Sequence, residues 1–380
     1  MKNKLLQISS DFADQKIYIN LVRELSLRGF VQQIYVPVRW SSKINGNRDD
    51  TIQNTTYHYS LILKPNIIFK LRYHRKLKII QKDIEQKIEL NDIELIHAHF
   101  LFSDGGVALR LKMQYGIPYV VSVRATDVHG FFPKMKHLRK FGNEIMYHAE
   151  KVIFINHAYK DLFRKKYLLK RYSEILDKTV VIPNAIDDHW FENNEMIKEI
   201  GNPVRILYVG RIIQRKKLDL VVRAVKRLNK LENAKEYVLE VVGDGEFMKS
   251  VKKISGPEVI FHGSISDFRE LKKIYERCHI FAMPAIKETF GLVYIEALSQ
   301  GLPIIYCINE GVYGFFEDSE VGVAVKANDM TQIIRALKLI PENYDQMSKN
   351  AKEASKAFRW DETTGKFVKV YGEALNRVPE

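Results

Sequence analysis

The sequence contains very little cysteine and no long apolar run. Its two cysteines, Cys278 and Cys307, each lie inside an apolar segment of strand length. We therefore expect two reduced core thiols, which is typical of a cytosolic protein and argues against a disulfide framework. The N-terminal MKNKLLQISS has too short an apolar run for a signal peptide, and no stretch of about 18 apolar residues occurs in the chain. These absences argue against secretion by that route and against a membrane span.

Acidic residues are scarce relative to basic ones. Lys and Arg number 60 against 46 Asp and Glu, which gives a net charge of +14. The excess is concentrated at residues 64–78, 132–140 and 164–171, where basic and apolar residues are mixed. Such mixtures suit an anionic membrane surface, although a solvated basic face explains any single cluster about as well. No recognised nucleic-acid motif accompanies the charge, so we expect no nucleic-acid partner.

The length and the order of the predicted elements indicate two domains. A chain of 380 residues with 46% hydrophobic and 28% charged residues suits two soluble α/β domains, each able to bury a core. Strands are predicted in the first half at 5–9, 33–38, 93–100, 118–123, 151–156 and 179–184. After a polar, acidic run the pattern restarts at Pro203. We place the first domain at 1–190, the linker at 191–202 and the second domain at 203–360.

The most informative stretch is Pro284–Ile305, PAIKETFGLVYIEALSQGLPII. Apolar and β-branched runs on either side of it predict two flanking strands. Residues 291–300 predict a helix between them, with Thr289 as N-cap and Gly301 just past the end. A helix that joins two strands in this way predicts a βαβ unit with parallel strands.

Two carboxylates, Glu288 and Glu296, lie eight residues apart in this unit. Glu288 is in the loop that leaves the carboxyl end of a strand, where ligands bind in open α/β sheets. The backbone N–H groups of Phe290, Gly291 and Leu292 would point out of the helix N-terminus, toward phosphate oxygens. Taken alone, however, the residues favour a structural explanation, with Glu288 as a first-turn charge and Glu296 on a solvated face.

Glu288-x7-Glu296, followed by Ala297-Leu298 and Gly301-Leu302-Pro303, resembles the E-x7-E motif of retaining glycosyltransferases of family 4. The resemblance implies the GT-B fold, in which two Rossmann-like, doubly wound domains face a central cleft. It implies that the C-terminal domain binds a nucleotide-sugar, here a UDP- or GDP-sugar, and that the N-terminal domain binds the acceptor. Glu288 would lie near the sugar and Glu296 on the ribose, and no metal or other cofactor is implied.

A second segment resembles the family motif G-R-x4-K-G. The chain has Gly210, Arg211 and Lys216, with Lys217 in place of the last glycine. An arginine and a lysine suit the neutralisation of a departing diphosphate. Positive charges are otherwise unfavourable at the N-terminal end of a helix, so the position of Arg211 and Lys216 favours an anionic partner.

Four further segments resemble the family. The loops at Gly243 and at Gly263–Ile265 match those that frame the donor, and each follows a predicted strand. VIPNAID at 181–187 matches the interdomain crossing, with Ala185 where the family has glycine. The last helix, 361–380, resembles the one that crosses back to complete the first domain.

The first half departs from the family at two places. Arg124 stands where the family often has a histidine, and Asp127 is kept. Arginine can bind phosphate or a sugar hydroxyl but cannot act as a general base near neutral pH, so we expect Arg124 to contact ligand. The first loop, Ser9-Ser10-Asp11-Phe12, lacks the glycine that is common in the family.

His97 and His99 alternate onto one face of the strand IELIHAHF. Two histidines without an evident third and fourth ligand are more often hydrogen-bonded structural groups than metal ligands, so we expect no metal. The resemblance places this strand against the cleft, and we therefore put His99 together with Asp127 on the acceptor side.

These observations predict a metal-independent, retaining hexosyltransferase of cell-envelope or exopolysaccharide biosynthesis. We expect Glu288, Arg211, Lys216 and Arg124 at the reacting centre, with front-side attack assisted by the leaving phosphate. The acceptor would be a glycan or a lipid-linked molecule. The protein would be cytoplasmic and would bind peripherally to the inner face of an anionic membrane. The alternatives are a membrane- or glycan-binding protein on an inactive GT-B scaffold, which the altered first loop and Arg124 favour, and a nucleotide-sugar epimerase.

Overall fold

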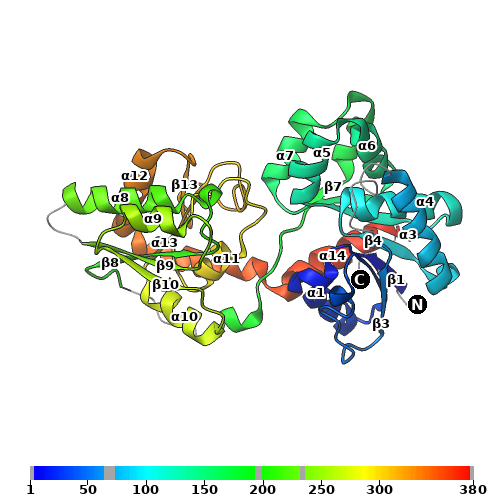
Figure 1. The fold of residues 1–380 in the computed structure, drawn as a ribbon, viewed down its shortest axis with the longest axis horizontal. Helices are drawn as coiled ribbons and strands as arrows, with labels where there is room; N and C mark the ends of the chain where they lie inside the picture. The colour runs from blue at the N-terminus through cyan, green and yellow to red at the C-terminus, as the bar shows by residue number, and fades with distance from the viewer. Residues whose placement is uncertain (1–3, 64–72, 193–198, 232–235, 377–380) are drawn as a thin grey trace. The chain divides into compact units, whose positions relative to one another are not determined.

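The computed structural model describes residues 4–63, 73–192, 199–231 and 236–376, and the chain divides into two compact units (Figure 1). The first unit comprises 1–155, 159–184 and 360–380, and the second comprises 156–158 and 185–359. The division therefore lies between Asn184 and Ala185, a few residues before the linker that the sequence predicts. The C-terminal helix belongs to the first unit.

The first unit contains a seven-stranded parallel sheet in the order β3-β2-β1-β4-β5-β6-β7. The order runs outward from β1 in both directions, which is a doubly wound arrangement. The strands are β1 (Lys4–Ile8), β2 (Val31–Val38), β3 (Thr55–Leu61), β4 (Leu95–Ala98), β5 (Tyr119–Val123), β6 (Lys151–Phe154) and β7 (Thr179–Val181).

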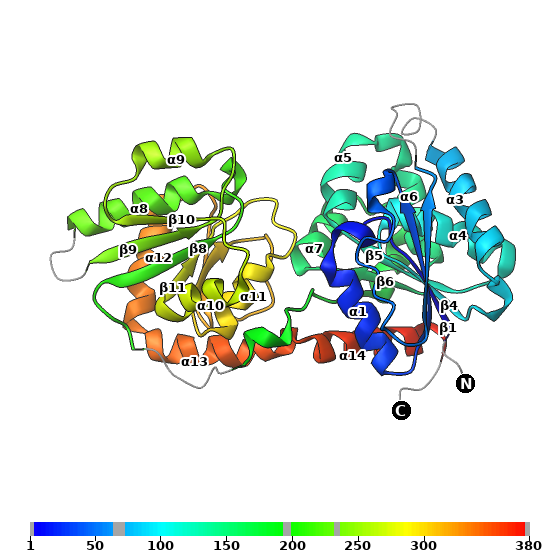
Figure 2. The same cartoon turned by 60° about the horizontal axis from the view of Figure 1, so that its bottom comes forward.

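Helices cover both faces of this sheet, so its central strands are buried on both sides (Figure 2). All residues of β4 and β5 are buried as a result. Helix α1 packs against α14, and α3 packs against α4. The helices are α1 (Lys16–Leu27), α3 (Tyr73–Lys87), α4 (Gly106–Tyr115), α5 (Phe132–Lys134), α6 (Arg139–His148), α7 (His157–Lys166) and α14 (Trp360–Ala374).

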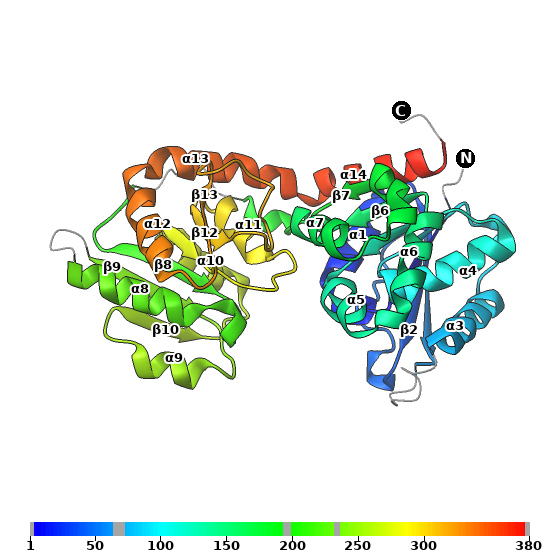
Figure 3. The same cartoon turned by 90° about the horizontal axis from the view of Figure 1, so that it is seen from above.

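The second unit contains a six-stranded parallel sheet in the order β10-β9-β8-β11-β12-β13 (Figure 3). Its strands are β8 (Val204–Val209), β9 (Tyr237–Val242), β10 (Val259–Gly263), β11 (Ile280–Ala282), β12 (Ile304–Cys307) and β13 (Gly322–Val325). Its helices are α8 (Leu218–Leu231), α9 (Met248–Ile254), α10 (Phe268–Arg277), α11 (Leu292–Ser299), α12 (Met330–Glu342) and α13 (Tyr344–Ser355). Two Rossmann-like, doubly wound sheets confirm the predicted fold class.

The predicted βαβ unit is confirmed, because β11 pairs in parallel with β12 and α11 lies between them. Gly301 follows the helix in the left-handed conformation, with φ +72°, as a C′ residue should. The predicted N-cap is wrong. Gly291, not Thr289, precedes the first helical residue, and its φ of +83° is a conformation that favours glycine.

Other expectations from composition can be compared with the structure. Cys278 and Cys307 are free and buried, which confirms them as core thiols. Among the described residues, no helix is both long and apolar enough to cross a membrane.

Candidate active site

Three glycines lie at the carboxyl ends of three neighbouring strands in the second unit. Gly210 follows β8, Gly243 follows β9 and Gly263 ends β10. The N–H of Gly210 donates to the carbonyl of Val242 at 3.0 Å, and the N–H of Gly243 donates to the carbonyl of Gly263 at 2.7 Å. A Cβ on Gly243 would lie 2.1 Å from the carbonyl oxygen of Gly210, so only glycine allows this close approach. The loops that were predicted to frame the donor therefore lie side by side.

Lys216 and Glu288 meet at the same edge of this sheet. They follow β8 and β11, which are neighbouring parallel strands, so their loops emerge together. Nζ of Lys216 donates to Oε2 of Glu288, and Nη1 of Arg215 lies 3.9 Å from the same oxygen. Glu288 is 8% exposed. The sequence identified both residues separately, whereas their contact is visible only in the structure.

The loop that carries Glu288 is held by hydrogen bonds from two directions. Nη1 of Arg215 donates to the carbonyl of Lys287 at 3.0 Å, and the N–H of Ile286 donates to the carbonyl of Arg215 at 2.9 Å. The N–H of Glu288 donates to Oε2 of Glu310 at 3.1 Å. Burial raises the pKa of Glu310. These contacts fix where the Glu288 carboxylate points.

Sequence reasoning missed Arg215 and Glu310. Arg215 lies inside the G-R-x4-K spacing, immediately before Lys216, so its position was a usable signal. Glu310 follows β12, and the general rule that polar residues after parallel strands line a binding edge would have selected it.

The N-terminus of α11 adjoins Glu288. Phe290 is 1% exposed and its ring packs against Phe315 and Phe358, with centroids 5.7 Å away in both cases. Its side chain is therefore core, and only the backbone at this position is available for a ligand. The first-turn amides of α11, beginning at Leu292, retain the anion-binding capacity of a helix N-terminus.

Glu296 lies on α11 and accepts a hydrogen bond from the hydroxyl of Tyr275 at 3.0 Å. Burial raises the pKa of Glu296 to about 7, which the Tyr275 bond opposes. The solvated face that the residues alone favoured is thus wrong for this side chain. Its expected contact with a ribose stays a prediction, and Tyr275 is the neighbour that the sequence did not indicate.

Arg211 and Ile265 complete the residues expected at the donor. Arg211 is exposed directly after Gly210, and its carbonyl accepts a bond from the hydroxyl of Tyr208 at 3.2 Å. Within the described part of the chain its guanidinium has no hydrogen bond or ion pair. Ile265 is half-buried beyond Gly263. Both lie past the carboxyl ends of their strands, as the sequence predicts.

Asp127 is completely buried in the first unit. Its carboxylate accepts from the backbone N–H groups of Arg124 at 2.9 Å, Leu101 at 3.2 Å and Phe102 at 3.1 Å. Burial raises its pKa to about 6, and the three N–H donors oppose this shift. Asp127 thus ties the turn after β5 to the turn after β4. The sequence expected it to project toward an acceptor, but no atom of its side chain is exposed here.

His97 and His99 are buried side by side, and each is hydrogen-bonded to other residues. Nδ1 of His97 bonds the hydroxyl of Tyr371 at 2.7 Å, its Nε2 bonds Oγ of Ser122 at 3.0 Å, and Nε2 of His99 bonds Oε1 of Gln7 at 2.7 Å. Burial lowers the pKa of His97 to about 3 and that of His99 far below its usual value. The structural role is confirmed. His99, expected on the acceptor side, has no exposed atom with which to contact an acceptor.

Arg124 is 9% exposed. Its Nη1 donates to Oδ1 of Asn184 at 3.1 Å, and its guanidinium lies 5.8 Å from the centroid of the Tyr18 ring. These contacts orient the side chain, whereas its proposed contact with ligand remains a prediction.

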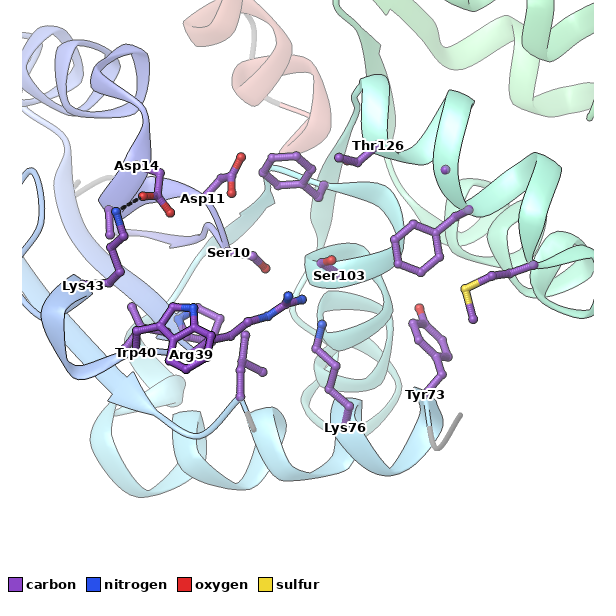
Figure 4. Close-up of a pocket in the computed structure, with 18 of the residues that line it drawn as sticks. Ser10, Asp11, Asp14, Arg39, Trp40, Lys43, Tyr73, Lys76, Ser103 and Thr126 are labelled. Carbon is purple, nitrogen blue, oxygen red and sulfur yellow. Dashed lines mark ion pairs between the residues drawn. The ribbon is translucent and has the colours of Figure 1, made fainter. Parts of the chain in front are cut away.

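A pocket of about 910 Å³ opens at the carboxyl ends of β1, β2, β4 and β5 in the first unit (Figure 4). It combines aromatic side chains with cations and hydroxyls, which suits a polar ligand with an apolar face. The residues used below are Ser10, Asp14, Arg39, Trp40, Lys43, Tyr73, Lys76, Phe100, Ser103 and Phe131. The sequence indicated the first loop and the basic clusters at 64–78 and 132–140, of which 64–72 lie outside the described residues. It did not indicate the residues after β2, because no motif marks them.

Comparisons with known proteins agree with this arrangement. Residues 17–190 match the family model Glycosyltransferase Family 4, and residues 191–357 match the model Glycosyl transferases group 1. An uncharacterized glycosyltransferase of Methanocaldococcus jannaschii, MJ1178, is 25% identical over 293 residues, which cover 75% of this chain and 77% of the relative.

Solved structures show the same fold. Sucrose-phosphate synthase from Thermosynechococcus elongatus superposes with a TM-score of 0.74 at 19% identity, covering 99% of this chain and 100% of the other. Anabaena HepE in complex with UDP gives a TM-score of 0.71 at 15% identity, covering 98% and 100%. The two models together span nearly the whole chain, and the chain therefore belongs to glycosyltransferase family 4 and has the GT-B fold.

Proposed function

We propose that this glycosyltransferase moves a sugar from a nucleotide-diphosphate donor, a UDP- or GDP-sugar, to a glycan or lipid-linked acceptor, with retention of configuration and without a metal ion. The observation that carries the proposal is the Lys216–Glu288 ion pair, with Arg215 beside it, at the carboxyl edge of the second unit's sheet. The similar HepE was solved with UDP, which supports a uridine donor.

The chemistry follows from where charge develops. When the bond between the anomeric carbon and the β-phosphate oxygen breaks, positive charge builds on the sugar and negative charge on the diphosphate. Lys216, Arg211 and the amides at residues 290–292 stabilise the diphosphate. The acceptor oxygen then bonds the anomeric carbon on the face that the phosphate leaves, and its proton passes to the departing phosphate oxygen.

Glu288 has two roles in this proposal. Its carboxylate accepts hydrogen bonds from hydroxyls of the donor sugar, and it keeps the ammonium of Lys216 at the diphosphate. Glu296 accepts hydrogen bonds from the ribose. In the first unit Arg124 contacts ligand, and the large pocket receives the acceptor.

We place the reaction in cell-envelope or exopolysaccharide assembly, in the cytoplasm at the inner face of the membrane. The basic residues of the first half support this location, since an anionic leaflet attracts Lys and Arg by about 1 kcal/mol each.

The test is a panel of UDP-, GDP- and ADP-sugars. For each donor, the shift in the melting temperature of the protein and the slow release of nucleotide by hydrolysis are measured. We expect one donor to stabilise the wild type and release nucleotide, and Glu288→Ala to lose most of both effects. The anomeric configuration of the product, read by NMR, tests retention, and turnover in excess EDTA tests metal independence. No shift and no hydrolysis with any donor would overturn the proposal in favour of a binding protein on this scaffold.

A further inference from the structure

Two cations in the pocket of the first unit have no neutralising contact. Arg39 directly follows β2, and Lys76 lies on α3. Figure 4 shows their charged ends pointing toward the same part of the pocket, beside Ser103. Over the residues that the structure describes, neither side chain forms a hydrogen bond or an ion pair. The pocket therefore presents two positive charges at one place.

Two other cations, Lys43 and Lys134, line the pocket, and Lys134 is exposed to solvent. Lys43 forms an ion pair with Asp14, drawn as a dashed line in Figure 4. Arg39 and Lys76 differ from both lysines because their charged ends point toward one place inside the pocket. The unpaired charge is located where several strands end, which is where ligands bind in this class of sheet.

Two acidic groups face these cations. Burial raises the pKa of Asp11, which lines the pocket, and the charge of Arg39 opposes this shift. Asp104 faces Lys76 from the α4 side. It is completely buried and accepts hydrogen bonds from the backbone N–H and the hydroxyl of Ser10. Burial raises the pKa of Asp104 to about 7, so it offsets only part of the positive charge near neutral pH. Burial and the charge of Arg39 lower the pKa of Lys76 to about 8, while Asp104 opposes this shift. An anion at this place would relieve the repulsion between Arg39 and Lys76.

We propose that Arg39 and Lys76 bind a phosphate group of the acceptor, so that this enzyme glycosylates a phosphate-bearing molecule. The inference rests on the proposed function in one respect, namely that this pocket receives the acceptor. A phosphate offers up to two negative charges and three oxygens, which match a guanidinium fork and an ammonium group. A neutral glycan would leave both cations unpaired.

The aromatic residues that line the rest of the pocket indicate what kind of group carries the phosphate. Trp40 is 55% exposed beside Arg39, and Phe100 and Phe131 also line the pocket. An aromatic wall next to a phosphate site suits a sugar ring or an isoprenoid chain. The phosphate belongs either to a soluble sugar phosphate or to the headgroup of a lipid-linked acceptor, and the same two residues would bind both.

The site is tested by titration with inorganic phosphate and with pyrophosphate. The change in the fluorescence of Trp40 reports binding. The experiment uses the Lys216→Met background, so that anions do not report from the donor site. We expect Arg39→Gln and Lys76→Met each to weaken binding by about tenfold or more, since a bond to a charged partner contributes at least that factor. Arg39→Lys should recover part of the affinity.

Two controls locate the effect. Lys78→Met removes the same charge from the exposed side of α3 and should leave the affinity unchanged. Trp40→Phe should remove the fluorescence response while calorimetry still records binding. Equal affinity in Arg39→Gln, Lys76→Met and the parent, or no binding by the parent, would overturn the proposal.

The source of the phosphate is then separated with two ligands. Glucose 6-phosphate is compared with glucose, and neutral vesicles containing polyprenyl phosphate are compared with phosphatidylglycerol vesicles. Binding of either phosphate ligand that falls in Arg39→Gln identifies the source and supports the proposal. Vesicle binding that depends only on net charge and ignores Arg39 contradicts it. Phosphate binding by a protein that hydrolyses no nucleotide-sugar would leave the anion site standing while the proposed function failed.

Discussion

The ammonium of Lys216 and the carboxylate of Glu288 form an ion pair although 72 residues separate them in the sequence. The pair forms because β8 and β11 are neighbours in a parallel sheet, which brings the loops after both strands to one edge. Both side chains are largely buried, so each depends on the other for compensation of its charge, and Arg215 adds a second positive charge near the Glu288 carboxylate.

Loss of either partner should lower catalysis strongly. We expect Lys216→Met to reduce kcat about 10²- to 10³-fold, the effect of removing one stabiliser of developing charge. Glu288→Gln should raise KM for the donor and lower kcat, because Lys216 loses its anchor. The double variant should lose less than the product of the two single losses. Steady-state kinetics on the donor identified above measure all three, with Lys230→Met on the exposed face of α8 as the control. Multiplicative losses would show that the two side chains act independently.

Lys217→Gly should stabilise the protein. Lys217 has φ +58°, a left-handed conformation that disfavours every residue with a Cβ. The expected gain is about 1 kcal/mol in the free energy of unfolding, reduced somewhat by the greater freedom of glycine in the unfolded chain. Urea denaturation measures it. Lys217→Ala is the matched control, because it removes the charge but keeps the Cβ and should give no comparable gain.

Glu296→Gln should change how stability depends on pH. The folded pKa of Glu296 is raised to about 7 from 4.5, so the folded state holds this proton more tightly than the unfolded state. Stability from this group is fully present below about pH 4.5 and is lost as pH rises through about 7. The variant should therefore exceed the wild type by roughly 1–3 kcal/mol at pH 8 and match it near pH 4. Urea unfolding at the two pH values measures the difference. A constant difference would mean that Glu296 titrates normally.

Tyr371→Phe should weaken the attachment of α14. The Tyr371 hydroxyl bonds Nδ1 of the buried His97, so its removal leaves that nitrogen without its partner at little change in shape. We expect a loss of about 1–2 kcal/mol in unfolding free energy. Tyr115→Phe, on the exposed end of α4, should change stability by less than about 0.5 kcal/mol. Hydrogen exchange should localise the effect of Tyr371→Phe to α14 and β4.

The local features around Glu288 were predictable from the sequence. Alternating strand and helix signals, the glycine at 301 and the length of the segment between two apolar runs predict the βαβ unit that is observed. The helix start was predicted wrongly, since Gly291 adopts a left-handed conformation in which a Cβ would lie 2.5 Å from the ring of Tyr294, and a local pattern does not contain this packing.

The pocket of the first unit illustrates what a linear pattern cannot predict. Arg39 belongs to no motif and Lys76 only to the basic cluster at 64–78, and their charged ends lie together because β2 ends beside the helix that precedes β4. The expectation for Asp127 differs from the structure in the opposite way. Its place in a family motif indicated a ligand, whereas three backbone N–H groups hold it inside the protein.

The sequence by itself determined the fold class, the two parallel sheets and the segments that bear chemistry, because hydrophobic periodicity and turn residues act over short distances along the chain. The tertiary structure alone decided which charges are paired, with Lys216 bound to Glu288 and Arg39 left beside Lys76. Pairing depends on strand order, because strand order sets the distance between residues that are remote in sequence. It also depends on burial, because burial sets the free-energy cost of leaving a charge without a partner.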